Sequence, residues 1–176
     1  ASLEGYLFPD TYRFYTNASA EDVVKTMLKN FGRKWTPELQ KQIVDSGRTT
    51  FQILTMASII ESEVQTDTDR RMVADIFWRR LRVGMALQAD STVNYATRGN
   101  SPAVSAKALA VDSPYNTYKY KGLPLGPICN PGLNAILAAL SPEKNNYWYF
   151  LTDKNGKVYY AATLEEQVAN KQKFLK

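Results

Sequence analysis

The run of residues 51–64, FQILTMASIIESEV, restricts the possible folds of this chain more than any other segment. Ile53, Ala57, Ile60 and Val64 recur at helical spacing, and apolar side chains occupy most of the circumference of the resulting helix. A helix that is apolar on nearly every side is buried in its protein. We therefore expect a central buried helix in this region, with Thr49 or Thr50 as its N-cap.

Glu61 lies at the border of the apolar stripe on this helix, one to two turns after Leu54 and Ser58. An apolar wall disfavours the ionised form of a carboxyl group, so Glu61 is predicted to hold a proton near neutral pH and donate it. The alternative is an ordinary carboxylate that reaches water or pairs with an arginine. Glu63 points to a different side of the helix, so the two glutamates cannot face each other as an acid pair.

The composition excludes several classes of site. The chain has 176 residues with 44% hydrophobic residues, which suits one domain with a sizeable core. With a single cysteine, Cys129, and no histidine, it cannot form common zinc sites or a Ser-His-Asp or Cys-His nucleophile. The net charge of +5 favours anionic partners. Nucleic acid is not expected among them, because basic and acidic residues alternate and no recognition motif is present.

Capping patterns predict three more helices before residue 84. The first begins at Ser19 with acidic residues in its first turn, and the second runs from Thr36-Pro37 to Ser46. The third begins in the segment 66–69 and ends at Gly84. Together with the central helix, these elements make residues 20–83 a helical block.

The segments on either side of this helical block differ from it in composition. Residues 1–16 are aromatic and extended with a turn, whereas residues 85–131 are rich in Gly, Pro, Asn, Ser and Tyr and are predicted to be irregular and functional. Asn130 is the expected N-cap of a helix that ends at Leu140. Segments 147–152 and 157–161 flank an Asn-Gly turn and predict a β-hairpin, and Thr163 begins the last helix with a capping box. The predicted fold class is therefore α+β.

Several motifs, in this order, make the chain similar to the YceG-like family of endolytic murein transglycosylases. The similarity extends from Leu3 to about Ala161. The motifs are Glu4–Tyr12 (EGYLFPDTY), Ala57–Glu63 (ASIIESE), Phe77–Leu81 (FWRRL) with Gly84-Met85, Leu87–Tyr95 (LQADSTVNY), Tyr115–Tyr118 (YNTY) and Gly122–Gly132 (GLPLGPICNPG).

The resemblance implies an activity, a location and a set of partners. Family members cleave peptidoglycan glycan strands between N-acetylmuramic acid and N-acetylglucosamine, leaving 1,6-anhydromuramyl ends, with no cofactor or metal. They act outside the cytoplasmic membrane, held by an N-terminal anchor and usually carrying a LysM-like subdomain. Both parts would precede Ala1, so residues 1–176 are expected to be a single catalytic domain. Glycan strands are the expected partner, and peptidoglycan synthases are candidate protein partners.

The resemblance also assigns site residues. The catalytic glutamate of the family motif falls on Glu61. Histidines that family members often have in and after the last hairpin are replaced here by Tyr159 or Tyr160 and by Gln167. We expect these positions to be structural or to line the substrate. The polar residues predicted to support or bind the sugar are Gln88, Asp90, Ser91, Thr92, Tyr95, Tyr115, Asn116, Thr117 and Tyr118.

Other interpretations of these residues remain open. Asp90, Ser91 and Thr92 would equally cap a short helix, and the segment 114–118 would equally form a structural turn. Eleven tyrosines and scattered amides would also suit a glycan-binding module without catalysis. A pyridoxal phosphate lyase is a third class, but no glycine-rich loop precedes a helix to hold the phosphate.

Overall fold

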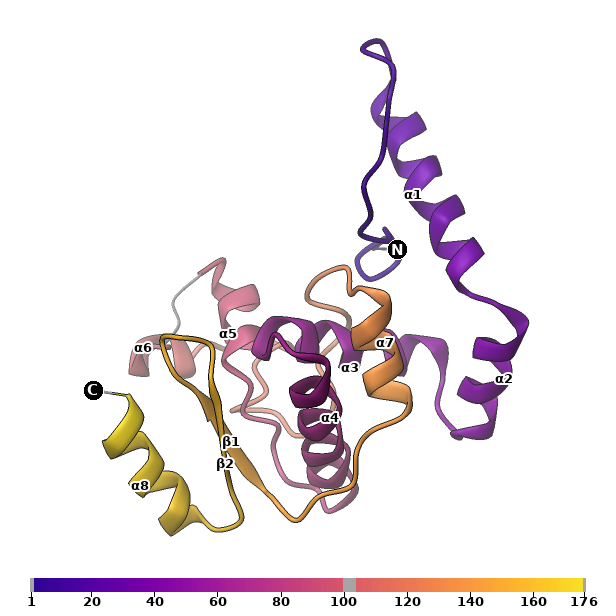
Figure 1. Ribbon diagram of the computed structural model, residues 1–176. Helices are drawn as coiled ribbons and strands as arrows, with labels where there is room; N and C mark the ends of the chain where they lie inside the picture. The colour runs from indigo at the N-terminus through magenta and orange to yellow at the C-terminus, as the bar shows by residue number, and fades with distance from the viewer. Residues whose placement is uncertain (1, 100–103, 176) are drawn as a thin grey trace.

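The computed structural model describes residues 2–99 and 104–175, and within them it has a mixed α+β fold (Figure 1). The α+β prediction is confirmed: helices dominate, and the two strands form one small antiparallel sheet. No helix in the described residues is long and apolar enough to cross a membrane. The elements are α1 (Ala20–Lys34), α2 (Pro37–Asp45), α3 (Thr50–Glu63), α4 (Asp67–Arg82), α5 (Asp90–Thr97), α6 (Ala106–Leu109), α7 (Leu133–Leu140), β1 (Tyr149–Thr152), β2 (Val158–Ala161) and α8 (Leu164–Phe174).

The core forms around α3, as its apolar sequence predicts. Every residue from Ile53 to Ile60 is buried. Helices α4 and α7 pack against this helix and against each other (Figure 1). The buried face of α7 includes Ala135, Ala138 and Ala139, whose small side chains let the helices approach closely. Thr49 is the N-cap of α3, and its hydroxyl accepts a hydrogen bond from the backbone N–H of Gln52 at 3.1 Å.

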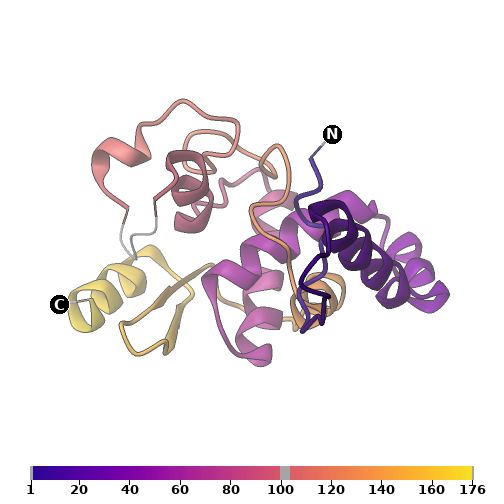
Figure 2. The same cartoon turned by 90° about the horizontal axis from the view of Figure 1, so that it is seen from above.

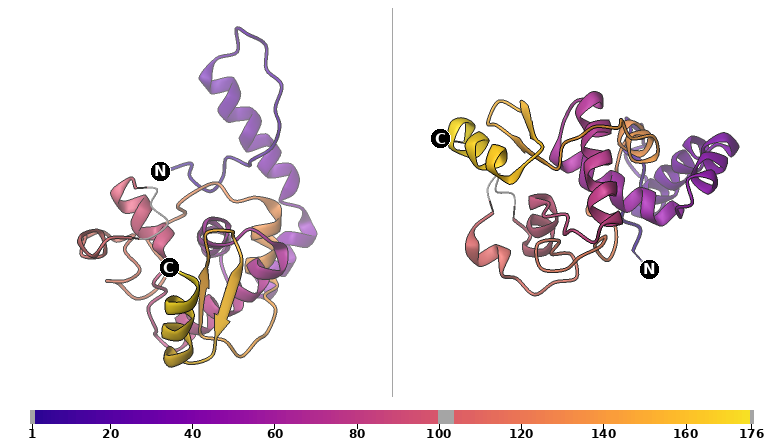
Figure 3. Two further views of the ribbon diagram at one scale, coloured as in Figure 1. Left: turned by 60° about the vertical axis from the view of Figure 1, so that its left-hand side comes forward. Right: turned by 90° about the horizontal axis from the view of Figure 1, so that it is seen from below.

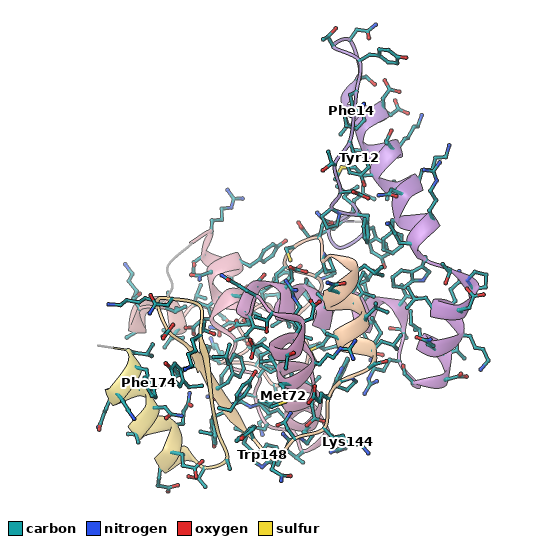
Figure 4. All side chains as sticks on the ribbon, viewed as in Figure 1. Tyr12, Phe14, Met72, Lys144, Trp148 and Phe174 are labelled. Carbon is teal, nitrogen blue, oxygen red and sulfur yellow. The ribbon has the colours of Figure 1, made fainter. Side chains whose placement is uncertain are left out.

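The N-terminal arm, residues 9–34, projects from the core (Figure 1), whereas Phe8 at its start is buried. Helix α1 has no buried residue, and the aromatic side chains of Tyr12 and Phe14 lie along the extended chain beside it (Figure 4). At the base of the arm, the ring of Phe31 packs against those of Tyr6 and Trp35, with centroid distances of 5.3 and 4.8 Å. These contacts dock the arm on the body by aromatic packing.

Two predictions in the loop region need correction. Residues 85–131 were expected to be irregular, but they contain α5 and α6. A short helix does begin at Asp90, yet its N-cap is Ala89 and no side chain caps it, so the capping alternative for Asp90, Ser91 and Thr92 is wrong. Asn130 does not cap α7, whose N-cap is Gly132. Instead, the Asn130 Oδ1 accepts hydrogen bonds from the backbone N–H groups of Gly5 and Leu7, at 2.8 and 3.1 Å. Its side chain is therefore committed to the N-terminal segment.

The predicted hairpin and last helix are both present and form one unit. Strands β1 and β2 pair antiparallel, with Phe150 opposite Tyr160. Helix α8 packs on both strands, and the ring of Phe174 stacks on that of Tyr159 with centroids 3.7 Å apart. Viewed from above, this unit and the α5–α6 segment lie on the same side of α3 and α4 (Figure 2). The irregular part of the chain thus faces the hairpin.

Candidate active site

A cavity of about 1190 Å³ lies between the end of α3, the α5–α6 segment and the α8–hairpin unit. In both views of Figure 3, the ribbons of the α5–α6 segment and of the α8–hairpin unit lie near each other. A cavity of this volume exceeds the usual pocket for a drug-sized ligand and would admit a segment of a polymer. Its wall carries carboxyl, amide, hydroxyl and aromatic groups, which are the groups that bind sugars.

Glu63 is the α3 carboxyl group that lines this cavity. Helix α3 ends at Glu63, and the next residue, Val64, is extended, so the side chain lies at the end of the helix. Its Oε1 accepts hydrogen bonds from the Ser91 backbone N–H at 3.1 Å and from the Ser91 hydroxyl at 2.6 Å. Burial raises the pKa of the Glu63 carboxyl, and nearby Asp90 adds to this, while the Ser91 bonds and Arg80 oppose it. Glu63 is thus suited to hold a proton.

Glu61 occupies a different environment. It does not line the cavity, because two residues of helix turn it through about 200° away from Glu63. Its Oε1 forms an ion pair with Arg70 Nη2 at 2.8 Å, and its Oε2 accepts the Gly132 backbone N–H at 3.1 Å. This is the arginine-paired alternative described above. The predicted role of Glu61 as the acid therefore gains no support from its contacts, which favour Glu63.

Five of the predicted binding residues do line the cavity. Gln88 is notable among them because its φ of +53° lies in the left-handed region, which a residue with a side chain rarely adopts. Its backbone N–H donates to the Thr117 carbonyl at 3.1 Å, which helps to hold this conformation. Backbone strain of this kind is concentrated at binding and catalytic sites. The five residues are Gln88, Asp90, Ser91, Tyr95 and Tyr118.

The other predicted binding residues lie behind the wall. Thr92 and Thr117 are buried and their hydroxyl groups are 2.9 Å apart. Asn116 is buried, and its Nδ2 donates to one backbone carbonyl at the end of α6 and to one just after that helix. Tyr115 packs its ring against that of Tyr95, with centroids 4.7 Å apart. These four residues do not line the cavity, so we assign them to shaping the wall and not to contacting a ligand.

Tyr118 and Asp90 form a polar pair in the wall. The Tyr118 hydroxyl donates a hydrogen bond to Asp90 Oδ1. Burial raises the pKa of the Tyr118 phenol, and the bond to Asp90 raises it further, so the phenol remains a donor at neutral pH. Asp90 is therefore held as an acceptor close to Glu63, where its charge favours a protonated Glu63.

Sequence reasoning missed the contribution of Arg80 and most of that of the α8–hairpin unit, where, among the residues that line the cavity, only the position of Gln167 was expected to be structural or to line the substrate. Arg80 was not among the predicted site residues, yet it is only 4% exposed and lines the cavity. Its Nη1 donates to the Leu87 carbonyl, and its Nε and Nη2 donate to the Trp148 carbonyl. The helical spacing of Val73, Phe77 and Arg80 places this arginine on the buried face of α4, and this signal could have distinguished it from Arg79 and Arg82. The lining residues of the α8–hairpin unit include Tyr149, Thr152, Lys154, Gln167 and Lys171.

Comparisons with known proteins agree with this architecture. The sequence profile of the YceG-like family matches residues 1–173. An endolytic murein transglycosylase of Bacillus subtilis (strain 168) is 43% identical over 98% of this chain and 48% of its own length. An endolytic murein transglycosylase of Streptococcus pneumoniae (strain D39) is 36% identical over 96% of this chain and 31% of its own.

A solved structure shows the same fold. The crystal structure of a putative yceG-like protein from Listeria monocytogenes superposes with a TM-score of 0.89, at 45% identity, over 95% of this chain and 55% of that one. The chain thus spans about half the length, or less, of the relatives that it matches.

Proposed function

Because the chain belongs to the YceG-like family, we propose that it cleaves peptidoglycan glycan strands as an endolytic lytic transglycosylase. The bond cleaved is the β-1,4 bond between N-acetylmuramic acid and N-acetylglucosamine, and the product carries a 1,6-anhydromuramyl end. The relatives named endolytic murein transglycosylase support this activity, although each is about twice as long as this chain or longer.

One observation carries the proposal: the Glu63 carboxyl, with its raised pKa, lines a cavity large enough for a glycan segment. Cleavage of a glycosidic bond requires a proton on the leaving oxygen. A carboxyl group that its surroundings keep protonated supplies that proton, as the catalytic glutamate of lysozyme does from its hydrophobic pocket. We therefore assign the acid to Glu63 and give Glu61 the task of holding the end of α3.

The proposed reaction has two steps on one carboxyl group. Glu63 first donates its proton to the leaving oxygen as the C1–O4 bond breaks, which leaves an oxocarbenium-like muramyl ring. The ionised Glu63 then takes the proton from the 6-hydroxyl of the same sugar as its oxygen bonds to C1. The proton returns to Glu63, no water is consumed, and the anhydro ring is closed.

The cavity wall supports these steps. The Ser91 backbone N–H and hydroxyl bind Glu63 Oε1 and stabilise the carboxylate formed between the steps. Asp90 adds negative charge near Glu63, and this favours return of the proton and stabilises a developing cation. Tyr95, Tyr118 and Gln88 offer a ring face, a hydroxyl and an amide to the sugars.

The location and partners follow from the proposed substrate. Peptidoglycan lies outside the cytoplasmic membrane, so we place the catalytic domain, residues 1–176, on that side. Attachment through a membrane anchor that precedes Ala1, and association with peptidoglycan synthases, belong to the same proposal.

A digest of purified glycan strands by the full-length protein tests the function. Mass spectrometry should detect new 1,6-anhydromuramyl ends from internal cleavage. Release of reducing muramyl ends would indicate hydrolysis and contradict the transglycosylase assignment. Binding of strands without any cleavage would favour the alternative of a non-catalytic glycan-binding module.

A further inference from the structure

The cavity extends past Glu63 to a second end that the proposed reaction does not use. This end is bounded by β1, the following turn and α8. Two lysines, an amide and apolar side chains line it, together with one carboxylate. We call this set the α8 end of the cavity, and its residues are Thr152, Asp153, Lys154, Leu164, Gln167, Lys171, Phe174 and Leu175.

The carboxylate at this end, that of Asp153, is engaged within the hairpin turn. Its Oδ1 accepts hydrogen bonds from the backbone N–H groups of Asn155 and Lys157, at 2.8 and 3.0 Å. These bonds lower the pKa of Asp153, so it stays ionised as part of the turn. The two lysines therefore leave this end with a net positive charge.

Gln167 has an unusual buried amide. The side chain is 7% exposed, and its Nε2 donates to the Phe150 carbonyl at 2.9 Å. Because a carbonyl can only accept, this bond fixes which side of the amide carries nitrogen and leaves Oε1 on the other side. Oε1 accepts no hydrogen bond from any residue that the structure describes. A buried acceptor without a donor is unfavourable, so a donor from a ligand would stabilise it.

The two lysines form no ion pair with a carboxylate in residues 2–99 and 104–175. Lys154 lies in the hairpin turn, and Lys171 lies one turn after Gln167 on α8. They differ in this from the lysines of the chain that pair with acidic neighbours, which are Lys25, Lys41 and Lys119. The α8 end thus presents positive charge toward the cavity, next to the apolar Phe174. An anion with N–H groups and small apolar side chains matches this combination.

We propose that the α8 end of the cavity binds the anionic peptide carried by the muramyl sugar, with Gln167 Oε1 accepting a peptide N–H and Lys154 and Lys171 attracting its carboxylates. This inference rests on the proposed function, because that peptide is a substituent of the proposed substrate. The amide groups of a peptide supply a donor for Gln167. Its carboxylates supply counterions for the two lysines, and its short side chains fit against Leu164 and Phe174.

The test compares two substrates with one enzyme. Full-length protein is given glycan strands that carry their peptides and strands from which an amidase has removed them, and kcat/KM is measured on each. The double variant Lys154→Ala and Lys171→Ala should lower kcat/KM on peptide-bearing strands by about five- to tenfold. This is the loss expected when two charge pairs between lysines and peptide carboxylates, both exposed to solvent, are removed. On peptide-free strands the same variant should stay within about twofold of wild type.

Two further variants make the test specific. Lys173→Ala removes the same charge from the same helix, but Lys173 does not line the cavity, so it should match wild type on both substrates. Gln167→Leu removes the unpaired acceptor and should lower kcat/KM on peptide-bearing strands alone. If that variant is destabilised, the double lysine variant still decides the matter.

The outcomes separate this inference from the proposed function. A loss confined to peptide-bearing strands supports the subsite. Equal losses on both substrates, or no loss on either, would overturn the subsite while leaving the transglycosylase proposal intact. Failure of the wild-type protein to cleave either kind of strand would overturn the proposed function and the subsite with it.

Discussion

Glu61 and Glu63 are chemically identical and two positions apart, yet their surroundings give them different properties. Both carboxylate oxygens of Glu61 are engaged, one by Arg70 and one by the backbone N–H of Gly132. Glu63 is hydrogen bonded by Ser91 through Oε1 and lines the cavity. A general acid must reach the atom to which it gives its proton, so access to the cavity is the property that separates the two residues.

The first prediction separates the two carboxyl groups by activity. Glu63→Gln should lower release of anhydromuramyl products by about 10²–10⁴-fold, the usual contribution of a general acid. Glu61→Gln should keep a substantial part of the activity, because an amide oxygen can still accept the Gly132 N–H. Product release is measured by mass spectrometry on matched amounts of folded protein. If Glu61→Gln is the inactive variant instead, the assignment of the acid to Glu63 is wrong.

The second prediction concerns the pH dependence of stability. The folded state raises the pKa of Glu63, so it binds this proton more tightly than the unfolded chain. The pKa of Glu63 in the unfolded chain is near the ordinary value of 4.5, and its pKa in the folded protein is higher. The free energy of unfolding therefore falls as the pH rises through the interval between these two pKa values. Glu63→Gln should be at least as stable as wild type at neutral pH, and the difference should shrink as the pH falls below 4.5.

Thermal unfolding at several pH values measures this difference. The hydrogen bonds from Ser91 are retained in part, since the Gln oxygen accepts from the same donors. A Glu63→Gln variant that loses stability at neutral pH but not in acid would show that the carboxylate form stabilises the fold, against the stated direction of the shift.

At the scale of elements, the N-terminal segment is attached to the body by a side chain that sequence reasoning assigned elsewhere. Asn130 precedes a proline and a helix, which is a typical N-cap context, but its Oδ1 instead accepts the N–H groups of Gly5 and Leu7. Gly5 has a φ of +90°, and a Cβ there would lie 2.6 Å from Pro127 Cγ. The segment and the loop before α7 thus fit closely, and Asn130 joins them.

The third prediction tests this attachment. Asn130→Ala leaves two partly buried N–H groups without an acceptor, and we expect a loss of about 1–3 kcal/mol in the free energy of unfolding. Urea denaturation measures the loss, and hydrogen exchange should increase at Gly5 and Leu7. The matched control is Asn134→Ala, whose exposed amide bonds Asp67 and should change stability by less than about 0.5 kcal/mol. Unchanged hydrogen exchange at the Gly5 N–H in this variant would show that Asn130 does not attach the N-terminal segment.

At the scale of the whole molecule, the cavity exists because distant parts of the chain are held together. Arg80 is central to this, since its guanidinium bonds the Leu87 carbonyl before α5 and the Trp148 carbonyl before β1. Both α5 and β1 contribute residues to the cavity wall. A planar group with five donors can bond both segments at once, which the single ammonium group of a lysine cannot do in the same geometry.

The fourth prediction follows from this link. Arg80→Met should destabilise the protein by about 3–5 kcal/mol, because it leaves buried carbonyl acceptors unpaired and removes a charge near Glu63. Arg82→Met, on the last turn of the same helix, should cost less than about 0.5 kcal/mol. Chemical denaturation of both variants gives the comparison. Equal stability of the two variants would show that Arg80 does not hold these segments together.

The helical block, the hairpin and the last helix could be predicted from the sequence because their signals are local. Ser19, Thr36 and Thr49 cap the helices that their positions indicate, and Thr163 begins α8 with a capping box. The candidate site was predicted in part: Gln88, Asp90, Ser91, Tyr95 and Tyr118 line the cavity. The local motifs found the right segments, but they also gave four residues that lie behind the wall, because a motif does not show which of its side chains face the cavity.

What the sequence alone determined is the set of elements and the family, since capping, apolar periodicity and ordered motifs depend on neighbours in the chain. The tertiary structure alone decided which α3 glutamate faces the cavity, because apolar residues surround most of that helix and periodicity cannot choose a face. It also decided that Arg80 bonds the Leu87 and Trp148 carbonyls and that Gln167 and Lys171 share a wall with Glu63. These relations depend on contacts between residues up to about a hundred positions apart, which no local pattern encodes.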